Sequence, residues 1–103
     1  MIINKEQIKK ILSEAIKKSK FKDSVEKASL FGSYAREEEN KESDIDVLIE
    51  FKPNVKIGLF EFVRFQRFLG ESAGRKVDLL TPESISKFFR DKIIKEAEII
   101  YEG

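Results

Sequence analysis

The feature that most restricts the fold is the alternation of apolar and polar side chains along residues 44–51, DIDVLIEF. Side chains of a β-strand point to opposite faces in turn, so a period of two predicts a strand with one buried face. One face carries Ile45, Val47, Ile49 and Phe51, and the other carries Asp44, Asp46, Leu48 and Glu50. The pattern therefore predicts a sheet that buries one side of this strand and leaves two acids at its head.

The rest of the chain divides into helical and strand-like segments. Helices are expected at 4–19, 58–71 and, as one or two elements, from Pro82 to Ile100, and further strands at 25–31 and 76–80. Asn4 and Gln7 resemble a capping box, Gly70 with Gly74 fits the exit of the helix at 58–71, and Thr81-Pro82 is a helix-start signal. Residues 34–39 are expected to form a short helix or a loop. This order predicts an α/β (α+β) fold, with a small sheet covered by helices.

The composition limits the chemistry that such a domain can perform. A chain of 103 residues fits a single domain spanning 1–103, and a net charge of +1 gives no general attraction to nucleic acid or to a membrane. Cysteine is absent, which is typical of a reducing, cytoplasmic location. Histidine is also absent, so the commonest general base is missing. Catalysis would have to use carboxylates, hydroxyls, amines and guanidinium groups.

Asp44 and Asp46 lie on the same side of the predicted strand, about 6.6 Å apart along it. At about 5 Å, with an effective dielectric constant of about 20, two such charges repel by roughly 3 kcal/mol. A divalent cation would reverse that repulsion, and Mg²⁺ prefers oxygen ligands of this kind together with substrate phosphates. An Asp-x-Asp pair is also typical of a solvated strand edge, so the pair alone does not decide between the two interpretations.

Three further features favour a phosphate-binding metal site. Gly32 permits a sharp turn and a close approach of the backbone to a ligand, and the Ser33 hydroxyl can bind phosphate oxygens if it opens a helix. Arg36 is one turn further on and adds a cation. Asp78 is a lone acid in the apolar strand at 76–80, and it would complete a set of three carboxylates if that strand pairs beside the one with Asp46. By itself, Asp78 could instead cap a turn or pair with Lys76 or Arg75.

The combination resembles the minimal nucleotidyltransferases of the DNA polymerase β-like superfamily. Their signature is Gly-Ser, ten residues, then Asp-x-Asp, which corresponds here to Gly32-Ser33, residues 34–43 and Asp44-Ile45-Asp46. The resemblance covers roughly residues 25–101, with the core motifs in 25–82, and it includes the segments SYAR, SDIDVLI, LFEFV, GRKVDLLTPE and EAEIIY. Glu37 is a departure, because many relatives have glycine after the arginine.

The resemblance implies a polymerase β-like fold in which Asp44, Asp46 and Asp78 are catalytic and bind Mg²⁺, with two ions expected. Gly32 and Ser33, with Arg36 beside them, would bind the phosphates of ATP. An acceptor hydroxyl would attack the α-phosphate and release pyrophosphate.

The resemblance also implies a partner, because larger relatives carry an extra domain that presents the acceptor. Minimal members are similar to antitoxins that transfer AMP to a tyrosine of a cognate HEPN-domain toxin. Two alternatives are an antitoxin that neutralises its toxin by contact alone, and a transferase for a small molecule such as an aminoglycoside. The aromatic-rich segment 59–69 is either partly exposed for docking or buried between the sheet and the terminal helix.

Overall fold

The computed structural model of the chain describes residues 4–32, 34–35 and 44–103. Within them, a mixed sheet contains β1 (Val25–Phe31), β2 (Ile45–Phe51), β3 (Val77–Leu80) and β4 (Glu98–Glu102). The strand order is β3-β2-β1-β4. β1 is antiparallel to both β2 and β4, whereas β2 and β3 are parallel. The α/β class and the mixed sheet expected from the sequence are confirmed.

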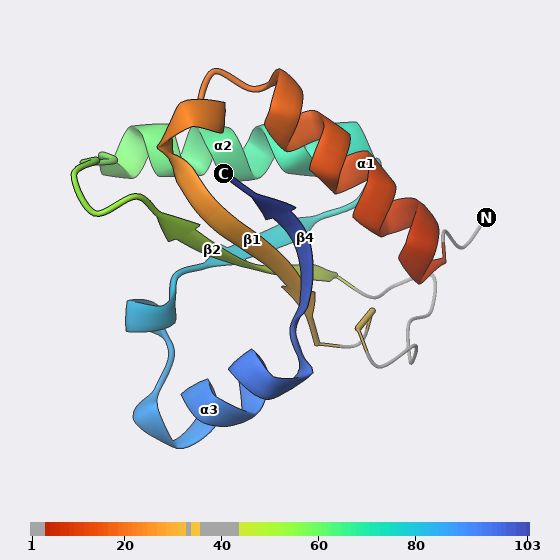
Figure 1. Cartoon of the computed structure of the whole chain (residues 1–103). Coiled ribbons are helices and arrows are strands. Elements are labelled where there is room, and N and C mark those ends of the chain that lie inside the picture. The colour runs from red at the N-terminus through yellow and green to blue at the C-terminus, as the bar shows by residue number, and fades with distance from the viewer. Residues whose placement is uncertain (1–3, 33, 36–43) are drawn as a thin grey trace.

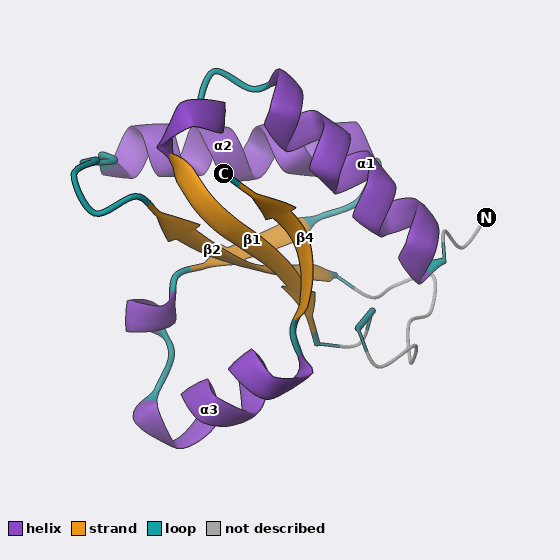
Figure 2. Ribbon diagram, viewed as in Figure 1, coloured by secondary structure: helices purple, strands orange, loops and turns teal. Residues whose placement is uncertain are grey.

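Helices lie on both faces of the sheet. α1 (Lys5–Lys18) and α2 (Leu59–Ala73) cover one face, and α3 (Lys87–Glu96) lies on the other, as Figure 1 shows. Figure 2 shows that α3 is joined to the sheet through loops and a short 3-10 helix at Pro82–Ser84. Another 3-10 turn, Lys22–Ser24, precedes β1. None of the helices in the described part of the chain has the length and apolar character that a membrane span requires.

α1 forms as its sequence predicts. The side chain of Asn4 accepts a hydrogen bond from the backbone of Gln7, and the side chain of Gln7 accepts one from the backbone of Asn4, which completes the capping box. The side chains at helical spacing face the core: Ile8, Leu12, Ala15 and Ile16 are buried.

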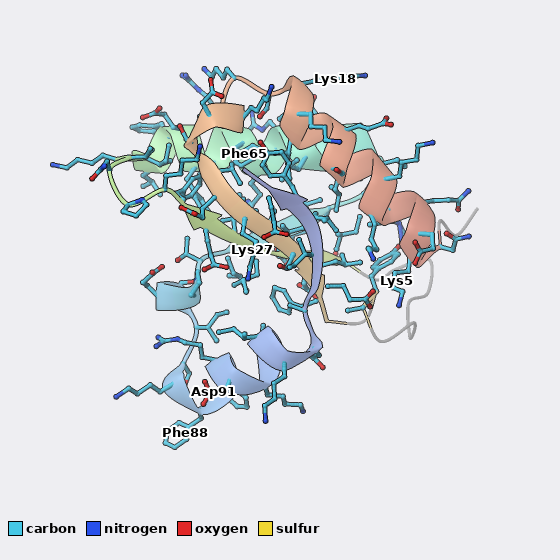
Figure 3. All side chains as sticks on the ribbon, in the orientation of Figure 1. Lys5, Lys18, Lys27, Phe65, Phe88 and Asp91 are labelled. Carbon is cyan, nitrogen blue, oxygen red and sulfur yellow. The ribbon has the colours of Figure 1, made fainter. Side chains whose placement is uncertain are left out.

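β2 contributes to two separate apolar clusters because its faces alternate. Ile45, Val47 and Ile49 pack in the main core beneath α1 and α2. That core includes the fully buried Phe65 of α2, which Figure 3 places between the helix and the sheet. Leu48 points to the opposite face, where a smaller cluster with Phe31 and Ile85 lies on the α3 side.

The C-terminal segment differs from the prediction. The sequence predicts helix from Pro82 to Ile100, but α3 begins only after Ser86, its N-cap, and ends before Ala97. Residues 98–102 form β4, which pairs with β1 at the free edge of the sheet and buries Ile100 in the main core. The backbone N–H and C=O groups along the edge of β1 need partners, so residues 98–102 form a strand although their apolar residues continue a helical spacing.

α2 also differs from one of the expectations. It packs against α1 and β3 instead of lying between the sheet and the terminal helix. Phe65, Leu69 and Ala73 face the core, whereas Leu59 and Phe60 at its first turn are exposed. The helix ends at Gly74, whose φ of 69° lies in the left-handed region and whose N–H bonds to the carbonyl of Gly70. The expected helix exit at Gly74 is thus confirmed, although the last residue of the helix is Ala73, two residues later than predicted.

Candidate functional site

The end of β1 brings the backbone of Gly32 against Asp46. Phe31, the last residue of β1, is paired with Asp46 in the antiparallel register. Gly32 follows with a φ of 75°, a conformation that favours glycine. A Cβ placed on Gly32 would overlap the carboxylate of Asp46 and would lie 3.0 Å from its Cγ. Glycine is therefore needed here for the positive φ of the turn and because the Asp46 carboxylate occupies the position that a Cβ would take.

Asp46 and Asp78 are neighbours across two parallel strands. Their Cα atoms are partners in the register of β2 and β3, and adjacent strands lie about 4.8 Å apart. Both side chains lie on the sheet face that also carries Leu48 and Leu80 of the smaller cluster. The predicted pairing of the two strands is confirmed, whereas the catalytic role of the acids stays a prediction.

Asp44 lies just before β2, and Lys76 lies just before β3. The Nζ atom of Lys76 is 3.8 Å from Oδ2 of Asp44 and 3.8 Å from Oδ1 of Asp78. The two segments are also joined through the backbone, because the N–H of Ile45 donates to the carbonyl of Lys76 at 3.0 Å. The carboxylates of Asp44 and Asp78 therefore flank one cationic group at the same end of the sheet.

Tyr34 and Arg75 connect the glycine turn to the start of β3. Tyr34 is fully buried, and its hydroxyl accepts a hydrogen bond of 3.0 Å from Nη1 of Arg75. The sequence indicated no role for Tyr34 and, for Arg75, only a possible ion pair with Asp78. Their positions in the sequence indicated that both lie near the candidate site, because Tyr34 follows the Gly-Ser pair and Arg75 belongs to the segment that contains Asp78. Together they fix the distance between the Gly32 turn and the third acid.

β3 is the edge strand of the sheet, and α2 holds it in place. The N–H of Leu79 donates to Oε1 of Gln66 at 2.9 Å, so a helix side chain takes the place of a missing neighbouring strand. This hydrogen bond is next to Asp78 in the sequence, and it fixes the strand that carries the acid.

Two predicted phosphate ligands, Ser33 and Arg36, lie outside the described residues. Among the described residues, no group of three His, Cys, Asp or Glu side chains is close enough to hold a metal ion alone. The donors present still fit Mg²⁺, which commonly uses one or two carboxylates and completes its shell with water and substrate phosphates. The all-oxygen donor set and the ammonium group of Lys76 within 3.8 Å of both Asp44 and Asp78 agree with such an ion.

The chain is similar to a known family and to several known proteins. The model of a family described as nucleotidyltransferase domain matches residues 6–101. A protein of Methanocaldococcus jannaschii, provisionally named a protein adenylyltransferase, is 41% identical over 92% of this chain and 94% of its own length. The protein adenylyltransferase MntA of Thermococcus cleftensis is 29% identical over 88% of this chain and 90% of its own.

Solved structures share the fold at lower sequence identity. A protein described as a minimal nucleotidyltransferase superposes with a TM-score of 0.74 and 24% identity, covering 92% of this chain and 94% of its own. A chain of a toxin-antitoxin complex with AMP-PNP superposes with a TM-score of 0.69 and 20% identity, and the match covers 98% of this chain and 75% of that one. A complex of an MNT antitoxin with a tri-AMPylated HEPN toxin from Shewanella oneidensis gives a TM-score of 0.64 and 16% identity. That match covers 92% of this chain and 73% of the matched chain.

Proposed function

This chain belongs to the nucleotidyltransferase domain family, and we propose on that premise that it transfers AMP from ATP to a tyrosine of a cognate HEPN toxin. The family membership makes it an enzyme of the nucleotidyltransferase kind. The observation that carries the proposal is the placement of Asp46 beside Asp78 in register, directly beneath the Gly32 turn. That placement puts two acids next to the position where a phosphate chain would pass.

We assign the roles of the residues from the family resemblance. Gly32, Ser33 and Arg36 are expected to bind the phosphates, and Asp44 and Asp46 are expected to hold Mg²⁺ on the triphosphate side. Asp78 is expected to help hold the ion that activates the acceptor hydroxyl. The contact of Gly32 with Asp46 and the register of Asp46 with Asp78 are compatible with these roles. Bound Mg²⁺ would supply neutralisation of phosphate charge and a lower pKa of the acceptor hydroxyl.

The bond changes follow from an attack on the α-phosphate. A bond forms between the tyrosine oxygen and the α-phosphorus, and the bond from the α-phosphorus to the oxygen bridging to the β-phosphate breaks. Pyrophosphate leaves with that electron pair, and the hydroxyl proton is released. The chain itself contributes position and charge, so the absence of histidine is compatible with this reaction.

A protein acceptor is supported by the surface as well as by the relatives. Leu59 and Phe60 are exposed next to each other at the first turn of α2. Phe88, which is 92% accessible, is exposed separately on α3, on the other side of the sheet, and Figure 3 shows it at the outer tip of that helix. Neighbouring exposed apolar side chains such as Leu59 and Phe60 are typical of protein interaction sites. We expect the 103 residues to act as one domain that relies on its partner to present the hydroxyl.

The experiment is to incubate the chain with ATP, Mg²⁺ and the protein encoded next to it, and to measure the partner's intact mass. Transfer predicts a partner heavier by one or more AMP groups, and Asp44→Ala should abolish that gain. An unchanged partner mass, with toxicity still neutralised by Asp44→Ala, would support the second candidate, an antitoxin that acts by contact. The exposed residues Phe60 and Phe88 also fit that candidate, whereas the paired acids favour catalysis.

A further inference from the structure

We propose that Lys76 is a positioning residue that holds Asp44 and Asp78 together in the metal-free protein and must withdraw when the first divalent ion binds. This inference rests on the proposed function, because it takes the two acids as metal ligands. Its starting observation is the position of one ammonium group at 3.8 Å from a carboxylate oxygen of each acid.

The position of Lys76 follows from the strand geometry. Lys76 lies just before β3, two residues before Asp78, and its ammonium group is 3.8 Å from Oδ1 of that acid. Asp44 stands in the neighbouring segment, because the N–H of Ile45 bonds to the carbonyl of Lys76 itself. This backbone hydrogen bond between the two segments therefore places Lys76 next to Asp44, with its ammonium group between the two acids.

The charges explain why the lysine is useful there. Without a cation, carboxylates gathered at one end of a sheet repel one another, and the Lys76 ammonium offsets part of that repulsion. A divalent ion carries twice the charge and would have to take the same space. Lys76 therefore keeps the acids oriented before binding and lowers their affinity for the ion.

The surroundings allow the lysine to move. Its side chain is 70% exposed, so little packing restrains the ammonium. Lys76 also lines an open groove of about 400 Å³, together with Arg67, Glu71 and Arg75. Movement of the ammonium group into this groove, towards Glu71, would leave the carboxylates of Asp44 and Asp78 available as metal ligands.

The test uses the chain alone, without nucleotide or partner, in two arms. In the first arm, Mg²⁺ is titrated by calorimetry into the unchanged protein, Lys76→Met and Lys76→Arg, with Lys92→Met on exposed α3 as the control. Removal of the competing charge should lower the Kd for Mg²⁺ by about three- to tenfold in Lys76→Met. Lys76→Arg and Lys92→Met should stay within about twofold of the unchanged protein.

In the second arm, thermal unfolding in EDTA compares Lys76→Met in the natural background and in the background of Asp44→Asn with Asp78→Asn. The substitution should lower the Tm by about 1–4 °C when both acids are charged and have a much smaller effect when they are not. A role in packing alone would give the same loss in both backgrounds.

Two results would overturn the inference. One is an Mg²⁺ affinity of Lys76→Met that equals or falls below that of the unchanged protein; the other is an equal loss of Tm in both backgrounds. Failure of the proposed function looks different, because then no AMP is transferred to the partner, while the difference in Mg²⁺ affinity and the coupling between Lys76 and the acids in EDTA remain.

Discussion

Asp46 and Asp78 face each other in register across the parallel strands β2 and β3. If both acids serve the transfer reaction, Asp46→Asn should lower AMP transfer by about two to three orders of magnitude, since loss of metal-ligand charge removes several kcal/mol of stabilisation. Transfer would be measured by the partner's mass with time. Asp91→Asn, on the exposed surface of α3 (Figure 3), is the matched control and should transfer AMP at the unchanged rate. Equal rates of AMP transfer by Asp46→Asn and Asp91→Asn would show that Asp46 is not needed for the reaction.

The contact between Gly32 and Asp46 makes a second prediction. Gly32→Ala and Gly74→Ala both place a side chain at positive φ, so each should cost about 1 kcal/mol of folding free energy. Only Gly32→Ala introduces a Cβ that overlaps the Asp46 carboxylate, since nothing lies within 4 Å of a Cβ at Gly74. Calorimetry with Mg²⁺ and ATP should therefore show weaker binding for Gly32→Ala alone. Equal binding by the two variants would mean that the site tolerates displacement of Asp46.

The hydrogen bond between buried Tyr34 and half-buried Arg75 makes a third prediction. Tyr34→Phe should lower the free energy of unfolding by about 1 kcal/mol, because the guanidinium group of Arg75 loses this acceptor. Tyr101→Phe is the control, since its hydroxyl makes an exposed bond of 3.4 Å to the carbonyl of Lys22, and the expected loss is below about 0.5 kcal/mol. Both values come from urea unfolding monitored by circular dichroism. A similar small loss in both variants would show that the turn does not depend on Arg75.

The pairing of β4 with α1 predicts a pH dependence. A hydrogen bond from Lys5, with further pairing to Lys9, holds the pKa of Glu98 below its ordinary value of 4.5. A carboxyl group whose pKa is lower in the folded state stabilises the fold above the unfolded pKa, and this contribution is lost as the pH falls through the lowered value. Glu98→Gln should therefore lower the Tm by roughly 1–4 °C at pH 7 and by progressively less below pH 4.5.

Melting curves at several pH values would check this dependence, with Glu14→Gln on the exposed side of α1 as the control. That variant should keep the Tm of the unchanged protein at pH 7. A constant difference between Glu98→Gln and the unchanged protein down to pH 3 would contradict the assignment.

Local patterns were sufficient for much of the fold. The capping box at Asn4, the alternation in 44–51 and the glycine exit at Gly74 each depend on residues close in the chain, and each is present in the structure. The C-terminal strand was missed for the opposite reason. Its five residues gain their hydrogen bonds from β1, some seventy residues earlier, so no neighbouring residue signals the partner.

For the candidate site, the sequence by itself determined the chemistry that was possible. The spacing of Gly32-Ser33 and Asp44-x-Asp46, and a lone acid at Asp78, were enough to indicate phosphate and metal. Only the tertiary structure placed Asp78 beside Asp46, Gly32 against the Asp46 carboxylate and Lys76 between two acids. Side-chain periodicity is a property of one segment, whereas strand register and contacts between loops arise when distant segments pack around a shared core.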